Sequence, residues 1–142
     1  MNPIRKGYEF FEHTADIGLR ASGSTLPDLF THAAQGLVEL LAEDSLIAWK
    51  DTRSVRLKAD SVDRLLHAWL TEVVFWFDSD RFLPGIYCLE VIGEQELIGQ
   101  VKGERFDTRR HSSGVEVKGI TRHAFSVTRV NEHWDASLIL DV

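Results

Sequence analysis

Hydrophobic residues recur along the chain at two spacings, and each spacing predicts a different kind of element. Near the start, YEFFEH (residues 8–13) and IGLRASG (17–23) alternate apolar or aromatic with polar positions, which is typical of strands, and the turn-like HTAD separates them. From residue 26 the spacing changes to three and four residues, which predicts an amphipathic helix capped by Ser24 or Thr25. The apolar stripe of that helix comprises Leu26, Leu29, Phe30, Ala33, Leu37, Leu40 and Leu41.

A second strand and helix pair follows. TRSVRLKA (52–59) has the two-residue period of a half-buried strand, and Ser61 is placed to cap a second helix. That helix carries Val62, Leu65, Leu66, Trp69, Val73 and Trp76 on one side. The tryptophans and Phe75 allow two interpretations, a docking surface for bases or a partner, or core packing. Core packing is favoured, because their spacing matches that of the neighbouring leucines.

The second half of the chain is rich in strand signals. IYCLEVIG (86–93) and LIGQVKG (97–103) flank a turn, residues 115–130 suit one bent strand or two shorter ones with Gly119 as a bulge, and WDASLILDV (134–142) forms the last strand. This order predicts a single domain over residues 1–142 with an α+β fold. We expect one mixed, largely antiparallel sheet that carries two amphipathic helices on one face.

Charge and composition narrow the function classes. The net charge of −6 argues against a protein that grips nucleic acid over a broad surface. Residues 101–123 are the exception, because six Lys or Arg against three Asp or Glu give this segment a charge of +3. Cys88 is the single cysteine, and we see neither a signal-peptide core nor an apolar run long enough for a bilayer, so we expect a cytoplasmic protein without a membrane partner.

Two carboxylates raise the question of a bound cation. In the last strand, alternation places Asp141 on the face opposite Leu138 and Leu140, next to the terminal carboxylate of Val142. Close like charges need compensation, and carboxylates with backbone carbonyls are the ligands of hard ions such as Ca²⁺ and Mg²⁺, so Asp16, Asp141 and the terminal group are candidate ligands. The alternative is that Asp16 only caps a turn and Asp141 is a solvated residue.

Other polar residues permit further interpretations. His13 either orients the turn before Asp16 or joins it and His123 in a zinc or iron site. Glu116 and Lys118 share one face of a strand and are either a surface pair or a site where Lys118 reaches a phosphate. No glycine-rich phosphate loop, nucleophile elbow or paired metal-protease histidines occur, so no motif identifies an enzyme.

Four separated motifs resemble the archease family: YEFFEHTADIGLRASGSTLPDLFTHAAQGLVELL, GERFDTRRH, VEVKGITRH and the terminal LILDV. The resemblance extends from about Tyr8 to Val142. It implies a small cytosolic α+β protein that assists an RtcB-type RNA ligase in tRNA splicing or RNA repair. Such proteins promote guanylylation and multiple turnover of the ligase, are not enzymes themselves, and meet RNA only indirectly.

The resemblance also implies roles for individual residues. Asp16 and Asp141, with the Val142 backbone, match the acidic metal-binding positions of the family, where we expect a divalent cation, Ca²⁺ first and Mg²⁺ or Mn²⁺ as alternatives. Lys118 matches a lysine on the ligase side, with His13 and Glu116 expected to contact the partner or its nucleotide.

The chain departs from the family pattern at two positions, and two rival functions stay open. VKGITRH carries Gly119 and Arg122 where the family more usually has alanine and tyrosine. One alternative function is a small metal-dependent phosphate-ester hydrolase that uses Asp16 and Asp141. The other is an RNA-binding module formed by residues 101–123.

Overall fold

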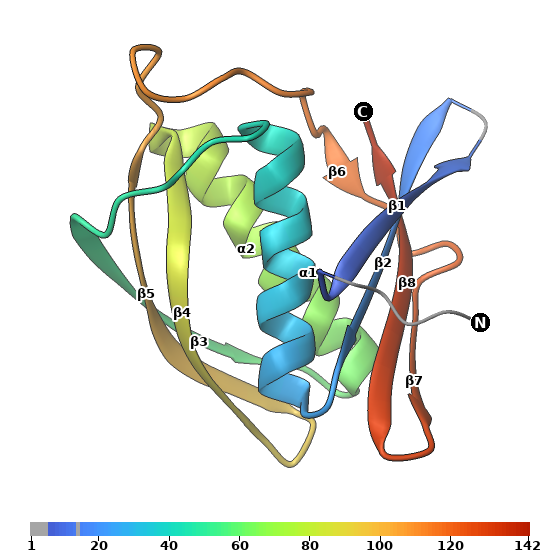
Figure 1. The fold of residues 1–142 in the computed structure, drawn as a ribbon. Helices are drawn as coiled ribbons and strands as arrows, with labels where there is room; N and C mark the ends of the chain where they lie inside the picture. The colour runs from blue at the N-terminus through green and yellow to red at the C-terminus, as the bar shows by residue number, and fades with distance from the viewer. Residues whose placement is uncertain (1–5, 14) are drawn as a thin grey trace.

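The structure, a computed structural model, describes residues 6–13 and 15–142 (Figure 1). Most of the chain lies in regular elements. In chain order they are β1 (Tyr8–His13), β2 (Asp16–Gly23), α1 (Leu26–Leu41), β3 (Asp51–Lys58), α2 (Val62–Asp80), β4 (Phe82–Ile92), β5 (Glu96–Arg105), β6 (Gly119–Ile120), β7 (Ser126–Val130) and β8 (His133–Asp141).

The strands form two antiparallel sheets, and the two helices lie between them (Figure 1). The larger sheet has the order β1-β2-β8-β6, with β7 also paired to β8, and the smaller has the order β3-β5-β4. Both helices contact strands of both sheets. The predicted α+β class, the antiparallel pairing and the two helices are confirmed, whereas the prediction of one sheet with both helices on one face is wrong. Strand patterns in a sequence show which residues are buried but not which strands pair.

Both helices begin at the predicted caps. The hydroxyl of Thr25 accepts the backbone N–H of Asp28 at 3.2 Å, and the hydroxyl of Ser61 accepts that of Arg64 at 3.3 Å. Each hydroxyl satisfies one of the N–H groups that a helix start leaves without a partner inside the helix. The chain therefore specifies the start of both helices locally.

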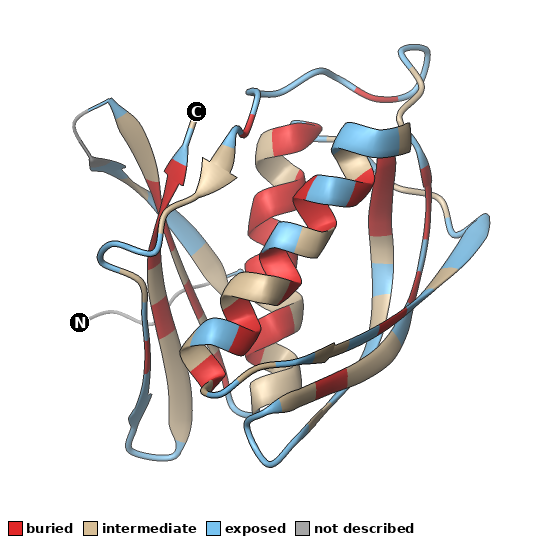
Figure 2. Ribbon diagram, turned by 180° about the vertical axis from the view of Figure 1, so that it is seen from behind, coloured by how far each residue is buried: buried red, intermediate tan, exposed pale blue. Residues whose placement is uncertain are grey.

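The buried faces of both helices meet in one continuous core (Figure 2). Trp69 is fully buried and donates its indole N–H to the Phe30 carbonyl at 3.0 Å, and Trp76 packs edge-on against it. Core packing is thus the correct interpretation for both tryptophans. Core packing is the wrong interpretation for Phe75, which is 61% exposed. Phe75 precedes Trp76 by one position, a rotation of about 100° around the helix, so the two side chains cannot share a face.

Residues 115–130 contain less strand than predicted. Only β6 and β7 are strands there, and Gly119 pairs with Asp141 in unshifted register, so the predicted bulge at Gly119 is wrong. Just before β6, the N–H groups of Gly114 and Val115 donate to the carbonyls of Leu41 and Leu40 at 3.2 and 2.8 Å. This segment therefore satisfies the C-terminal carbonyls of α1 instead of adding a strand.

The last strand, β8, lies inside the larger sheet, with β2 on one side and β6 and β7 on the other. Its predicted alternation holds, since Ala136, Leu138 and Leu140 are buried in the core. Ile139, on the other face, is also buried. Among residues 6–13 and 15–142, no helix combines the length and apolarity needed to span a membrane.

Candidate functional site

The register of the larger sheet brings the two predicted acidic positions to the same end of neighbouring strands. Ile17 of β2 pairs with Leu140 of β8, and the residues next in line are Asp16, at the start of β2, and Asp141, at the end of β8. Asp141 is exposed and Asp16 is partly buried. Two carboxylates from near opposite ends of the sequence thus lie at the same end of two paired strands. We call this end of the sheet, with Val142, the acidic tip.

The residue that precedes strand β6, Lys118, adds a cation next to the acidic tip. Gly119 pairs with Asp141, and the backbone N–H of Lys118 donates to the Asp141 carbonyl at 2.8 Å. Lys118 and Glu116 are both exposed and flank Val117, which is 3% exposed, so their side chains project on the face away from the core. Lys118 is therefore fixed beside the tip by its own backbone.

The other predicted partner residues are placed differently. His13 ends β1 opposite Asp16 in the hairpin register, but its side chain lies outside what the structure describes. Glu116 lines a cavity of about 450 Å³ together with Phe77 and Arg81 at the end of α2. His123 is exposed, and its backbone N–H donates to the Thr121 hydroxyl at 3.0 Å.

The donors at the tip suit a hard cation better than zinc. Within the described part of the chain, neither Asp16 nor Asp141 forms an ion pair, and no three or more His, Cys, Asp or Glu side chains come together as a metal-binding group. The zinc or iron interpretation with His123 therefore gains no support. Two carboxylates with backbone carbonyls are an all-oxygen set, which Ca²⁺ or Mg²⁺ accepts when water completes the shell.

A buried polar cluster, which sequence reasoning missed, lies at the other side of the molecule. Glu104 of β5 is 3% exposed, and its two carboxylate oxygens have four donors around them. Oε2 accepts the Ala48 N–H at 2.5 Å and the His111 Nε2 at 3.0 Å, while Oε1 meets the guanidinium of Arg110 at 2.5 Å and the ammonium of Lys50 at 3.5 Å.

The chemistry of this cluster is well defined. Burial alone raises the pKa of the Glu104 carboxyl group, but the bonds from Ala48, His111 and Arg110 outweigh that effect and hold the pKa below its ordinary value. The N–H of Asp107 donates to the Nδ1 of His111 at 2.9 Å, so Nε2 carries the ring proton that reaches Glu104. The only signal in the sequence is a Glu and a His seven residues apart within GERFDTRRH.

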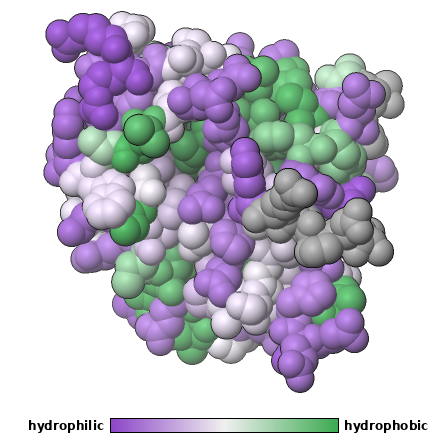
Figure 3. All heavy atoms as spheres, viewed as in Figure 1, coloured by the Kyte–Doolittle hydropathy of each residue, from purple (hydrophilic) through white to green (hydrophobic). Residues whose placement is uncertain are grey.

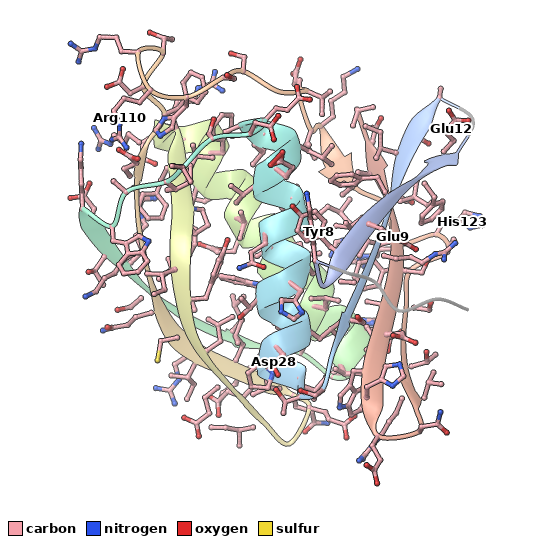
Figure 4. The ribbon with its side chains drawn as sticks, viewed as in Figure 1. Tyr8, Glu9, Glu12, Asp28, Arg110 and His123 are labelled. Carbon is pink, nitrogen blue, oxygen red and sulfur yellow. The ribbon has the colours of Figure 1, made fainter. Side chains whose placement is uncertain are left out.

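A separate groove of about 960 Å³ runs along the exposed side of α2, next to the end of β3. Phe75 lines it with His67 and Phe125, and its charged residues are of both signs, including Arg64 and Glu72. Of the predicted metal and partner residues whose side chains the structure describes, none lines this groove. Figure 4 shows Glu12 and His123 on the side of the β1–β2 hairpin, and Arg110 at the opposite upper corner.

The fold defines the chain as a small α+β protein in which two helices lie between two antiparallel sheets. The sequence model of the Archease protein family (MTH1598/TM1083) matches residues 8–142. This chain therefore belongs to the archease family.

Individual relatives agree with that assignment. The protein archease of Sulfurisphaera tokodaii is 31% identical over 137 residues, covering 95% of this chain and 98% of that protein. The archease of Pyrococcus furiosus is 30% identical with the same coverage.

Two solved structures share the fold. The solution structure of protein 1598 from Methanobacterium thermoautotrophicum has a TM-score of 0.81 at 30% identity, covering 96% of this chain and 99% of that one. A crystal structure from Thermotoga maritima, described as an archease and possible chaperone, has a TM-score of 0.63 at 17% identity with 100% of both chains covered. At that identity the second likeness concerns the fold alone.

Proposed function

We propose that this protein is a metal-binding accessory protein of an RtcB-type RNA ligase, and that it promotes guanylylation and multiple turnover of that ligase in tRNA splicing or RNA repair. Family membership supports an accessory role, and the Thermotoga maritima relative carries the description of a possible chaperone. We expect the protein to work in the cytoplasm, without catalytic activity of its own.

The observation that carries the proposal is the β2–β8–β6 register. It brings Asp16, Asp141 and Lys118 to the same end of the larger sheet, although they come from three different parts of the sequence. The two carboxylates, with the Val142 backbone, would hold the divalent cation, for which Ca²⁺ is our first candidate. The ion, when bound, supplies positive charge that can face phosphate oxygens.

The residues at the acidic tip suggest how assistance would work. The paired ends of β2 and β8 would hold Asp16 and Asp141 in place, and Lys118 would place an ammonium group within reach of a phosphate in the nucleotide cleft of the ligase. Binding that is tighter in the rearranged cleft than in the resting one would shift the ligase toward its active state. The bond-making steps would belong to the ligase.

The test measures ligase guanylylation and repeated ligation with the wild type and with Asp16→Asn, Asp141→Asn and Lys118→Ala. Glu90→Gln is the matched control, because Glu90 is an exposed strand carboxylate on the other sheet. We expect the three tip variants to lose most of the stimulation and the control to keep it. Full stimulation by both aspartate variants would refute the role of the tip.

Two further measurements separate the parts of the proposal. Calorimetric titration of the protein alone with Ca²⁺, Mg²⁺ and Mn²⁺ should give heat of binding that Asp16→Asn and Asp141→Asn abolish. Incubation of the protein alone with nucleotides and RNA tests the hydrolase alternative, because release of phosphate-ester products that depends on Asp16 and Asp141 would contradict an accessory role.

A further inference from the structure

The segment between α1 and β3 exposes two large apolar side chains. Leu46 is 87% exposed and Trp49 is 61% exposed, whereas Trp69 and Trp76 are buried in the core. A tryptophan buries more apolar area than most side chains, so one left in water is often part of a binding surface. Its surroundings determine what it can bind.

The backbone on both sides of Trp49 is held in place. The N–H of Ala48 donates to the buried Glu104 carboxylate at 2.5 Å, and the N–H of Lys50 donates to the Gly103 carbonyl at 3.0 Å. Both bonds anchor the segment to β5. Trp49 is therefore presented from a fixed backbone, which lowers the entropy lost when a ligand binds.

Cationic side chains surround the same anchor. Lys50 and Arg110 both pair with Glu104, and their side chains are 63% and 40% exposed while that of Glu104 is only 4% exposed. One buried carboxylate cannot neutralise two cations, so positive charge is left facing the solvent. Arg109, in the same loop, is 88% exposed, and among the residues that the structure describes its one ion-pair partner is the nearby Asp107 at 3.4 Å.

Arg105 of β5 also belongs to this surface; its side chain is 69% exposed and pairs at 3.4 Å with Asp80, a carboxylate that it shares with Arg53. We call Trp49, Lys50, Arg105, Arg109 and Arg110 the basic corner. In Figure 3, hydrophilic side chains gather at the upper corner over the loop that follows β5, with a small hydrophobic patch next to them. Figure 4 places Arg110 at this corner, away from the β1–β2 hairpin. The basic corner is thus distinct from the acidic tip.

We propose that the basic corner binds single-stranded RNA. The face of an indole ring stacks on an unpaired base, and ammonium and guanidinium groups pair with the phosphates on either side of that base. The local excess of positive charge fits a polyanion, although the whole protein carries −6. In the segment between α1 and β3, Leu46 is the one other large apolar side chain that is exposed, which is less apolar surface than the core of a protein interface contains. Direct binding departs from the expectation, drawn from the family resemblance, that the protein meets RNA only indirectly. The inference goes beyond the accessory role and does not depend on it.

The test uses fluorescence anisotropy of a labelled single-stranded 12-nucleotide RNA with the full-length protein alone at low salt. Nonspecific contacts of this kind give dissociation constants of about 1–100 μM. Trp49→Ala should weaken binding about tenfold, and Trp49→Tyr should restore most of the affinity, because stacking on an aromatic ring is what is lost and regained. Arg109→Gln should weaken binding less and reduce the slope of log K against log salt by about one.

Phe75→Ala is the matched control, because Phe75 has the same 61% exposure but lies on α2 beside the mixed-charge groove. Its affinity for RNA should equal that of the wild type. Unchanged thermal unfolding of Trp49→Ala would show that the loss is not caused by misfolding.

Two results would overturn the proposal. The first is that the wild-type protein does not bind the RNA at 100 μM protein and low salt. The second is that Trp49→Ala binds RNA as tightly as the wild type does. If this variant then also binds the ligase more weakly than the wild type, the basic corner is a docking surface for a protein. Neither result depends on a measurement of guanylylation, so the RNA experiment and the test of the proposed function can fail independently.

Discussion

Removal of the Glu104 carboxylate is the sharpest test of how the basic corner is built. In Glu104→Ala, the N–H groups of Ala48 and His111 and the cations of Lys50 and Arg110 all lose their acceptor. Deleting one partner of a buried ion pair destabilises a protein by about 3–5 kcal/mol, because the charge left behind has no compensation. Here Arg110 is 40% exposed and can turn to water, so we expect the lower end, about 3 kcal/mol.

This loss is large against the whole stability of a domain. A chain of 142 residues has a free energy of unfolding of about 5–15 kcal/mol, and 3 kcal/mol lowers the melting temperature by roughly 10 °C. Urea unfolding followed by circular dichroism gives the free energy directly. Glu104→Gln separates volume from charge, because glutamine fills the same space but presents an amide N–H₂ to one pair of donors.

The pH dependence of the unfolding free energy tests independently whether the ionised Glu104 carboxylate stabilises the fold. The folded-state pKa of Glu104 lies below its ordinary value, so its carboxylate contributes stability above the unfolded pKa of about 4.3, and this contribution disappears as the pH falls through the folded pKa. The difference in unfolding free energy between wild type and Glu104→Gln should therefore be largest near pH 7 and shrink in acid. A loss below about 1 kcal/mol for Glu104→Ala at pH 7, or a difference that grows in acid, would refute this reasoning.

Two other substitutions test the frame of the fold. A Cβ at Gly114 would lie 1.8 Å from the carbonyl oxygen of Leu40, so Gly114→Ala should destabilise the protein by about 1–3 kcal/mol in urea unfolding, and an unchanged midpoint would show that the loop moves freely away from α1. Ser61→Ala removes the hydroxyl that accepts the Arg64 N–H at 3.3 Å and should lower stability by about 1 kcal/mol, whereas Ser61→Asp should retain it; equal losses in the two variants would contradict a capping role.

The local parts of the fold could be predicted from the sequence, because their causes are local. Thr25 and Ser61 precede apolar stripes of helical period, and both helices start where these signals stand. The strands on either side of HTAD and the last strand are also confirmed. Each of these elements depends on residues within a few positions of one another.

The arrangement of the elements depends on distant residues and was predicted less well. Nothing in the periodicity of Val55 or Leu57 shows that β3 joins a separate sheet with β5 and β4. Glu104 could not be recognised as buried, because a carboxylate is normally exposed and its donors come from positions 48, 50, 110 and 111.

The candidate site divides in the same way. Asp16, Asp141 and Lys118 could be predicted from the sequence as candidate site residues. The register of β2, β8 and β6 brings them to the same end of the sheet, and this register could not be predicted. The bound cation stays a prediction. Trp49 carried no signal in the sequence because its exposure follows from the anchoring of its neighbours on β5.

The pairing of β2 with β8 has a kinetic consequence. Ile17 meets Leu140 across nearly the whole chain, whereas β3, α2, β4 and β5 are consecutive in sequence and complete their own sheet. Closing so long a loop has a high entropic barrier, so chains with distant contacts fold slowly. We expect the three-stranded sheet and α2 to assemble first and the β2–β8 pairing to form after the transition state. Substitutions that weaken this pairing should therefore speed unfolding and leave the folding rate almost unchanged.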